Sequence, residues 1–342
     1  MLSDYCKDRN NNLNIIRFLS AIFVLYYHSF PLTNSGVDHL DQLTNGQIDF
    51  GGLAVSIFFF YGGFLICKSI IRINDGKQFF KNRLCRIMPG LALVVFVSVF
   101  VIGPVFTHNS IIEYFSDYRT YKYLLNSVFV LVHQLPGVFE DNVYNDTVNG
   151  SLWTLPVEVL CYILCYLLWK LKFLEKKKFP FVIIAAVLFY VVMNSLLAPY
   201  TLIRSALRPA LLFFCGICAY VFKDIIPVNR IIAGFMFLLC IISIVMNVFN
   251  VFMFISLTYC LLFLGYGTTY KASSFGNRYE ISYGIYLVGF PIQQILCDVT
   301  KNNIGQLANF IIATIISILL GLLIAVFDNR INRLINTKKT IT

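Results

Sequence analysis

The amino-acid sequence predicts an all-α polytopic membrane protein, a bundle of about ten transmembrane helices with both termini in the cytoplasm. Three observations predict this fold class. Hydrophobic residues make up 58% of the 342 residues and charged residues only 13%, whereas soluble domains carry about 25% charged residues. Apolar runs of about 20 residues, the length that crosses a bilayer, recur along the chain. Basic residues gather in alternate connections between these runs, as orientation in a membrane requires.

The apolar runs define ten spans within one integral-membrane domain, residues 1–342. We predict spans at 14–33, 50–71, 87–107, 153–171, 180–198, 205–222, 231–248, 251–270, 281–299 and 306–327. A further run, 123–139, contains His133, Gln134 and Pro136 and is only weakly apolar. We therefore expect this run to be interfacial or re-entrant.

The placement of the basic residues predicts the orientation. With the N-terminus inside, 21 of the 27 lysines and arginines lie in cytoplasmic segments, which satisfies the positive-inside rule. If run 123–139 crossed the membrane fully, the lysine cluster at 170–178 would fall outside. The net charge of +10 is therefore explained by orientation, and no nucleic-acid partner is expected.

Two ionisable residues lie within the first span. Arg17 and His28 are eleven residues apart, about three helical turns, so they point the same way and are separated by roughly 16 Å along the axis. An ionisable group near the centre of a membrane costs at least ~2.5 kcal/mol, so it normally faces a protein interior and has a function there. Arg17 has a competing interpretation as a snorkelling anchor at the cytoplasmic interface.

A carboxylate enters the membrane in another span. Glu158 lies about five residues inside its helix, ~8 Å deep, and His28 lies ~6 Å from the outer end of its own helix. A carboxylate at similar depth could orient the imidazole and stabilise its charge, as is usual for a histidine base. The alternative is that each side chain finds an unrelated hydrogen bond within the bundle.

A basic pair precedes the third span. Arg83 and Arg86 are three residues apart and therefore neighbours if the stretch is helical. Guanidinium groups at this spacing suit phosphate oxygens, although an ordinary basic inner loop that touches anionic lipid head groups has the same composition. No phosphate loop, zinc-protease motif or dinucleotide fingerprint is present, and no metal is expected. The ten cysteines lie mostly within or beside spans, where packing explains them.

Four segments resemble the motifs of membrane-bound acyltransferase family 3, in the order found in that family. The first is an arginine, ten residues and a histidine, here Arg17 and His28. The others are Arg83-Leu84-Cys85-Arg86 before Ile87-Met88-Pro89, then Gly150-Ser151-Leu152-Trp153-Thr154-Leu155-Pro156-Val157-Glu158, then Ser282-Tyr283-Gly284-Ile285-Tyr286-Leu287. The resemblance runs from about residue 10 to 330. Some family members have a histidine shortly after the last segment, where this chain has Val288-Gly289-Phe290-Pro291.

The resemblance implies an O-acyltransferase of the bacterial inner membrane, in the stand-alone form without an added esterase domain. It implies transfer of an acyl group, expected to be acetyl, from cytoplasmic acyl-CoA to a hydroxyl of an extracytoplasmic or lipid-linked glycan such as O-antigen, capsule or exopolysaccharide. It also implies roles for individual residues: catalysis by His28 and Glu158, binding of acetyl-CoA by Arg17, Arg83 and Arg86, and substrate binding by Ser151, Trp153 and Tyr283.

Two other function classes stay open at this point. A proton-coupled transporter or flippase would use Arg17, His28 and Glu158 as a polar pathway, and a non-catalytic membrane scaffold would leave these residues unexplained. Transfer or hydrolysis of labelled acetyl-CoA distinguishes the enzyme from both. The acceptor sugar, its hydroxyl position and the oligomeric state leave no recognisable mark in the sequence.

Overall fold

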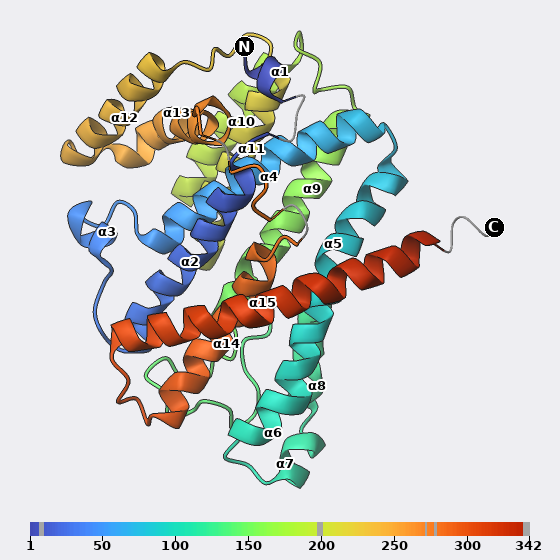
Figure 1. Ribbon diagram of the computed structural model, residues 1–342, viewed down its shortest axis with the longest axis vertical. Coiled ribbons are helices and arrows are strands. Elements are labelled where there is room, and N and C mark those ends of the chain that lie inside the picture. The colour runs from blue at the N-terminus through green and yellow to red at the C-terminus, as the bar shows by residue number, and fades with distance from the viewer. Residues whose placement is uncertain (7–9, 197–200, 271, 277–278, 338–342) are drawn as a thin grey trace. The chain divides into compact units, whose positions relative to one another are not determined.

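The regular secondary structure is helical. The computed structural model describes residues 1–6, 10–196, 201–270, 272–276 and 279–337, and the side chains of 201–204 and 336–337 lie outside this description. Within these ranges there is no β-strand, only an isolated antiparallel bridge between Thr107 and Val138. The α-helices (Figure 1) are α1 (Leu2–Tyr5), α2 (Leu13–Leu32), α3 (His39–Leu43), α4 (Phe50–Ile73), α5 (Gly76–Val97), α6 (Gly103–Phe106), α7 (Ile111–Ser116), α8 (Tyr118–Lys122), α9 (Thr154–Lys170), α10 (Phe179–Leu196), α11 (Thr201–Val221), α12 (Arg230–Val245), α13 (Phe249–Leu262), α14 (Ser282–Val299) and α15 (Gln306–Thr337).

Four short helices of other types complete the chain. They are the π-helices η1 (Ser98–Ile102) and η4 (Phe263–Gly267) and the 3₁₀-helices η2 (Tyr123–Val128) and η3 (Gly150–Trp153). Each of the four continues directly into or out of an α-helix, so that α5, η1 and α6 form one helical stretch from residue 76 to 106. The prediction of an all-α protein is confirmed.

Each of the ten predicted spans contains a helix. In the described chain, seven helical stretches are long and apolar enough to cross a membrane: α2, α4, α5 with η1 and α6, η3 with α9, α10, α13 with η4, and α15. The described parts of α11 and α12 are apolar but shorter, and α14 carries Gln293 and Gln294 in its middle. These helices support a polytopic membrane protein. The number of crossings and the sides of the termini stay predictions, and the end of the predicted span 180–198 lies outside the described residues.

The run 123–139 forms no long helix. After η2 the chain reverses, because the Asn126 side chain donates to the Val132 carbonyl at 2.8 Å and accepts from the Val132 amide at 3.1 Å. The rest of the run has no regular secondary structure. Its interfacial or re-entrant placement stays a prediction.

The described chain divides into two compact units, and α2, α3, α5 and α9 contribute residues to both. The first unit comprises Met1–Ser20, Leu40–Phe79 and Val157–Phe275, and the second comprises Ala21–His39, Phe80–Pro156 and Gly276–Thr342.

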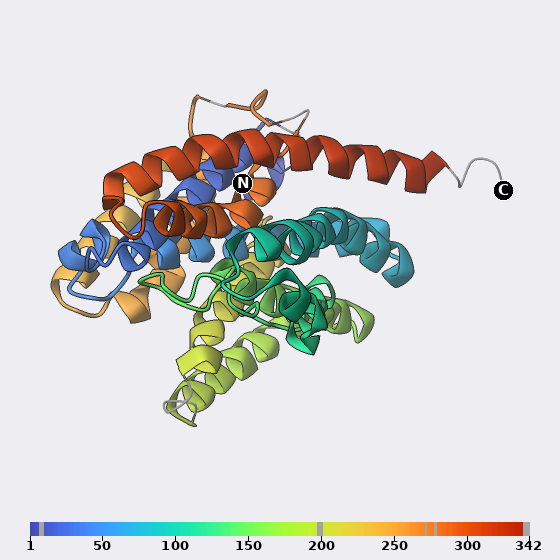
Figure 2. The ribbon, with the colours of Figure 1, turned by 90° about the horizontal axis from the view of Figure 1, so that it is seen from below.

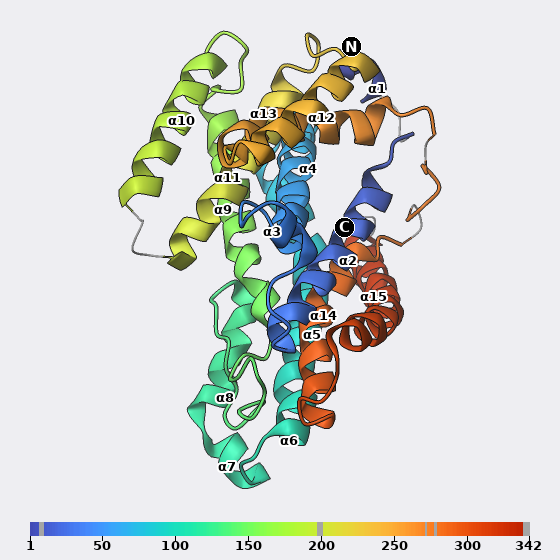
Figure 3. The same ribbon diagram turned by 90° about the vertical axis from the view of Figure 1, so that its left-hand side faces the viewer.

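In the first unit, α4 and α11 pack closely through glycine. A Cβ atom added at Gly63 would lie 1.8 Å from the Phe213 carbonyl oxygen, and one at Gly216 would lie 2.0 Å from the Phe60 carbonyl oxygen. Small residues allow this approach of two backbones, which is the usual way that membrane helices associate. Helix α10 packs beside α11 (Figure 3).

In the second unit, α14 and α15 also meet at glycines. A Cβ atom added at Gly284 would lie 2.7 Å from the backbone of Gly321. Helix α15 runs past this crossing as one long, uninterrupted helix (Figure 2). Most residues of α14 are buried, which makes it a core helix of this unit.

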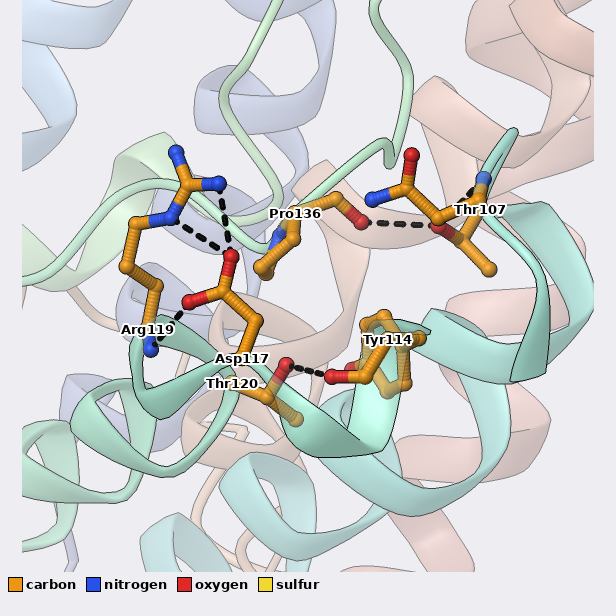
Figure 4. Close-up of polar contacts among 7 residues, drawn as sticks. Thr107, Tyr114, Asp117, Arg119, Thr120 and Pro136 are labelled. Atoms are coloured by element: carbon orange, nitrogen blue, oxygen red, sulfur yellow. Dashed lines mark hydrogen bonds and ion pairs between the residues drawn. The ribbon is translucent and has the colours of Figure 1, made fainter. Parts of the chain in front are cut away.

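The chain beyond α6 is a polar, hydrogen-bonded segment of the same unit (Figure 4). Ser110 and Glu113 form a capping box at the start of α7, which satisfies two free backbone amides of the first turn. Thr107 donates to the Pro136 carbonyl at 2.8 Å and Thr120 donates to the Tyr114 carbonyl. The Arg119 guanidinium donates to Asp117 at 2.8 Å, and this hydrogen bond lowers the pKa of the Asp117 carboxyl.

Candidate active site

The candidate site begins at a break in the hydrogen-bond ladder of α14. Pro291 has no amide hydrogen, so the carbonyl of Leu287, one turn earlier, loses its usual helical donor. The Asn149 side chain takes that place and donates to the Leu287 carbonyl at 2.9 Å. The same side chain accepts from the Ser151 amide at 3.1 Å and caps η3. Asn149 is buried and thereby fixes the start of the motif on α14.

Tyr286 of α14 holds the rest of this segment. Its phenol donates to the Ser151 carbonyl at 2.6 Å and accepts from the Thr154 hydroxyl at 2.6 Å. Unpaired polar groups are costly where water is excluded. Here one buried phenol provides a hydrogen-bond partner for the Ser151 carbonyl of η3 and for the Thr154 hydroxyl at the start of α9. Ser151 is therefore held in place through its amide and through its carbonyl.

The His28 side chain lies next to Ser151. The Ser151 hydroxyl and the Nε2 atom of His28 are 3.4 Å apart, which is a long hydrogen bond. The Phe290 ring packs edge-to-face on the imidazole, with ring centroids 5.0 Å apart. The Phe290 ring also explains why residue 150 is a glycine, because a Cβ atom added at Gly150 would lie 2.8 Å from this ring.

Two glutamines hold the helical turn that carries His28. Gln293 of α14 is fully buried and donates to the Leu25 carbonyl at 2.9 Å, one turn before His28. Gln306 at the start of α15 donates to the Ser29 hydroxyl at 2.7 Å, directly after it. His28 is thus fixed from both sides along its own helix, and it is one of the few ionisable residues on an apolar run.

A second cluster of polar residues lies around the start of α14: Arg83, Arg86, Glu280 and Tyr283. Arg86 forms an ion pair with Glu280 at 2.5 Å, with 39% and 28% of the two side chains exposed. Tyr283 donates to the Ile87 carbonyl of α5 at 2.8 Å. Arg83 lies half-buried one turn before Arg86 on the same helix. The predicted helical neighbourhood of the two arginines is confirmed, and Arg86 already has an acidic partner that the sequence did not indicate.

Helix α14 contributes a residue to each of the two clusters, the one at His28 and the one at the arginine pair. Tyr283 contacts the Ile87 carbonyl, one residue after Arg86, and Phe290 contacts His28. The two residues are seven positions apart, which corresponds to about 10 Å along the helix. Five of the predicted site residues other than His28 therefore belong to the same unit as it does: Arg83, Arg86, Ser151, Trp153 and Tyr283. Trp153 is half-buried at the end of η3.

The histidine can serve as a base in this setting. When Nε2 donates to Ser151, the lone pair lies on Nδ1; when Ser151 donates, the lone pair lies on Nε2. A hydroxyl can donate or accept, so Ser151 is compatible with either tautomer, and in both cases it orients the ring. A hydroxyl next to the imidazole is also a polar partner for a substrate.

Arg17 and Glu158 belong to the first unit. The Arg17 guanidinium carbon lies 6.0 Å from the centre of the Phe58 ring, a distance at which a cation and a ring face attract one another. Glu158 accepts a hydrogen bond from Tyr162, one turn further along α9. The role that the sequence suggests for Glu158, to orient the His28 imidazole and stabilise its charge, stays a prediction.

Six residues of the site were not singled out from the sequence. They are Asn149, Glu280, Tyr286, Phe290, Gln293 and Gln306. A signal for the first was present, because a proline in a long apolar helix frees a carbonyl and a polar residue elsewhere must compensate for it. Glutamines inside a membrane helix are a similar signal. Neither pattern identifies the partner.

Comparison with known proteins places the chain in a family. The chain is 27% identical over 301 residues to an O-acetyl transferase of Shigella phage Sf6, which covers 85% of this chain and 86% of the relative. It is 26% identical over 166 residues to nodulation protein 10 of Rhizobium leguminosarum bv. viciae, which covers 47% of this chain and 44% of the relative. No solved structure matches. The acyltransferase domain model of acyltransferase family 3 matches residues 10–326, a range that includes every residue of the site. The chain belongs to this family and is an acyltransferase.

Proposed function

We propose that the protein moves an acetyl group from acetyl-CoA to a hydroxyl group of a carbohydrate. The observation that carries the proposal is the contact between His28 and Ser151, because it joins the histidine of one family motif to the serine of another at 3.4 Å. The name of the phage relative, O-acetyl transferase, supports acetyl as the group and oxygen as the acceptor atom. Family membership favours an enzyme over the transporter that the sequence left open.

In the proposed reaction His28 acts as general base. It accepts the proton of the acceptor hydroxyl while the oxygen forms a bond to the thioester carbon of acetyl-CoA. The carbon–sulfur bond then breaks, and the coenzyme A thiolate leaves and takes up a proton. Ser151 holds the imidazole during this step. General-base catalysis of this kind contributes about 10²- to 10⁴-fold to the rate.

The donor is proposed to bind through arginines. Arg83 and Arg86 precede the first apolar turns of α5, where guanidinium groups suit the phosphates of coenzyme A. Arg86 would share its charge between the donor and Glu280. Arg17 is proposed as a third donor ligand. Trp153 and Tyr283 are proposed to contact substrates from the ends of η3 and α14.

The acceptor is proposed to be an extracytoplasmic or lipid-linked glycan, and the protein to be a multi-pass protein of a bacterial inner membrane. Acetyl-CoA is highly anionic and does not cross a bilayer unaided. In the predicted orientation the arginine pair lies on the cytoplasmic side and His28 near the outer side. The pantetheine arm would then bridge the two along α14.

The test of the function is transfer of labelled acetyl groups by the purified protein. We expect His28→Ala to lower kcat by about 10²- to 10⁴-fold, since it removes the base, and to leave expression and membrane insertion intact. Mass spectrometry of the glycan should show one acetyl unit fewer in cells that carry this variant. Normal acetylation by His28→Ala would contradict the assignment of the base.

Replacement of Arg83 or Arg86 by alanine should raise the KM for acetyl-CoA more than the KM for the acceptor. A charge-assisted hydrogen bond to phosphate is worth about 1.5–3 kcal/mol, or roughly 10- to 100-fold. Substitution by lysine should restore only part of the affinity, because the planar fork is lost. Glu280→Gln should keep or lower the KM for acetyl-CoA, since it releases Arg86.

A matched control is Arg119→Ala, which removes another arginine that is paired with a carboxylate of the same unit. It should leave the KM for acetyl-CoA unchanged. If the Arg83 and Arg86 variants both bound acetyl-CoA with wild-type affinity, the two arginines would instead be assigned to contacts with lipid head groups.

Glu158 is proposed to act through its negative charge. Glu158→Gln should therefore lower kcat sharply without a change in the KM for acetyl-CoA. The matched control is Tyr162→Phe, which removes the hydrogen bond that Glu158 accepts but keeps the carboxylate. Equal losses in the two variants would show that Glu158 serves the packing of α9 and has no catalytic role.

A further inference from the structure

The loop between Phe139 and Asn149 presents an exposed aromatic ring. Tyr144 has 44% of its surface exposed, in a segment without regular secondary structure. Exposed rings are common at the ends of membrane proteins, where tyrosine is enriched at the interface with water. Tyr144 differs from an ordinary interfacial ring because a buried side chain donates a hydrogen bond to its backbone carbonyl.

A buried glutamine fixes this loop. The Gln294 side chain of α14 is 0% exposed and donates to the carbonyl of Tyr144 at 2.6 Å and to that of Thr147 at 2.7 Å. The buried Asn142 side chain donates to the side-chain oxygen and to the carbonyl of Gln294, at 2.9 and 3.0 Å. The backbone beneath the exposed ring is therefore ordered by side chains that are themselves buried. An ordered ring loses less conformational entropy on binding than a mobile one.

The ring of Tyr144 is two ring contacts away from the imidazole of His28. Tyr144 packs edge-to-face on Phe290 with centroids 5.9 Å apart, and Phe290 packs edge-to-face on His28 with centroids 5.0 Å apart. Phe290 is buried, whereas Tyr144 is exposed. One aromatic row thus leads from the proposed base to the surface, and all three residues belong to the second unit.

We propose that Tyr144 is a binding platform for the acceptor, on which the C–H face of a pyranose ring stacks while a hydroxyl of the glycan reaches His28. The face of an aromatic ring carries negative charge density and suits the weakly positive C–H groups of a sugar. The hydroxyls at the rim of the pyranose stay directed to water or to polar groups of the loop. This inference rests on the proposed function, because it names the place where the acceptor of that reaction binds.

The experiment measures acetyl transfer by membranes that contain the full-length protein. The donor is labelled acetyl-CoA, and the acceptor is the glycan fraction extracted from a host strain that lacks the gene. Tyr144→Ala should raise the KM for the glycan by about three- to ten-fold, the equivalent of one aromatic contact. The KM for acetyl-CoA should not change. Tyr144→Trp keeps a stacking face and should restore the glycan KM to within about two-fold.

Tyr118→Ala is the matched control, since Tyr118 is another exposed tyrosine of the same unit, with 73% of its surface exposed. It should leave both KM values unchanged. If Tyr144→Ala had the same KM for the glycan as the wild type, the inference would be overturned. The proposed function would still stand, provided that the wild-type protein transfers acetyl groups. Equal increases in the two KM values would also overturn it and assign Tyr144 to packing or to the membrane interface. Absence of transfer by the wild type would overturn the proposed function, and this inference with it.

Discussion

The candidate site depends on one missing hydrogen bond donor. Pro291 leaves the Leu287 carbonyl of α14 without its helical partner, and Asn149 supplies the replacement at 2.9 Å. A carbonyl left unpaired in an apolar environment costs up to several kcal/mol, so this position of α14 requires a polar partner. The partner comes from the loop before η3, and the segment that contains Ser151 is thereby attached to α14.

Helix α14 organises the rest of the site around that attachment. Successive turns direct Tyr283 to α5, Tyr286 to η3, Phe290 to His28, and Gln293 to the helical turn before His28. Glycine crossings bring α15 against the same helix. Here most of the polar groups join two segments far apart in sequence, which explains how one helix can hold the turn before His28, the segment with Ser151 and helix α5.

The sequence was sufficient for the fold class and for the helices, for identifiable physical reasons. The site residues that it indicates stay predictions, although the structure brings His28 and Ser151 together. Apolar runs of membrane length have few alternatives to a helix, so α2 and α4 were predicted to within two residues at each end. His28 stood out because an ionisable side chain in such a run is costly. The partners were out of reach: Glu280 beside Arg86, and Tyr286 beside Ser151, are separated from them by more than a hundred residues. Hydropathy carries no information on which polar groups meet across helices.

We expect Asn149 to act by placing Ser151 against His28, and a double-mutant cycle on kcat tests whether the two residues work as one unit. Asn149→Ala and Ser151→Ala are measured singly and together for acetyl transfer, with membrane insertion as the control for folding. If Asn149 acts through Ser151, the double variant should be no slower than the slower single variant, since residues that act as a unit are not additive. Losses that multiply in the double variant would contradict the account, because the two residues would then contribute independently.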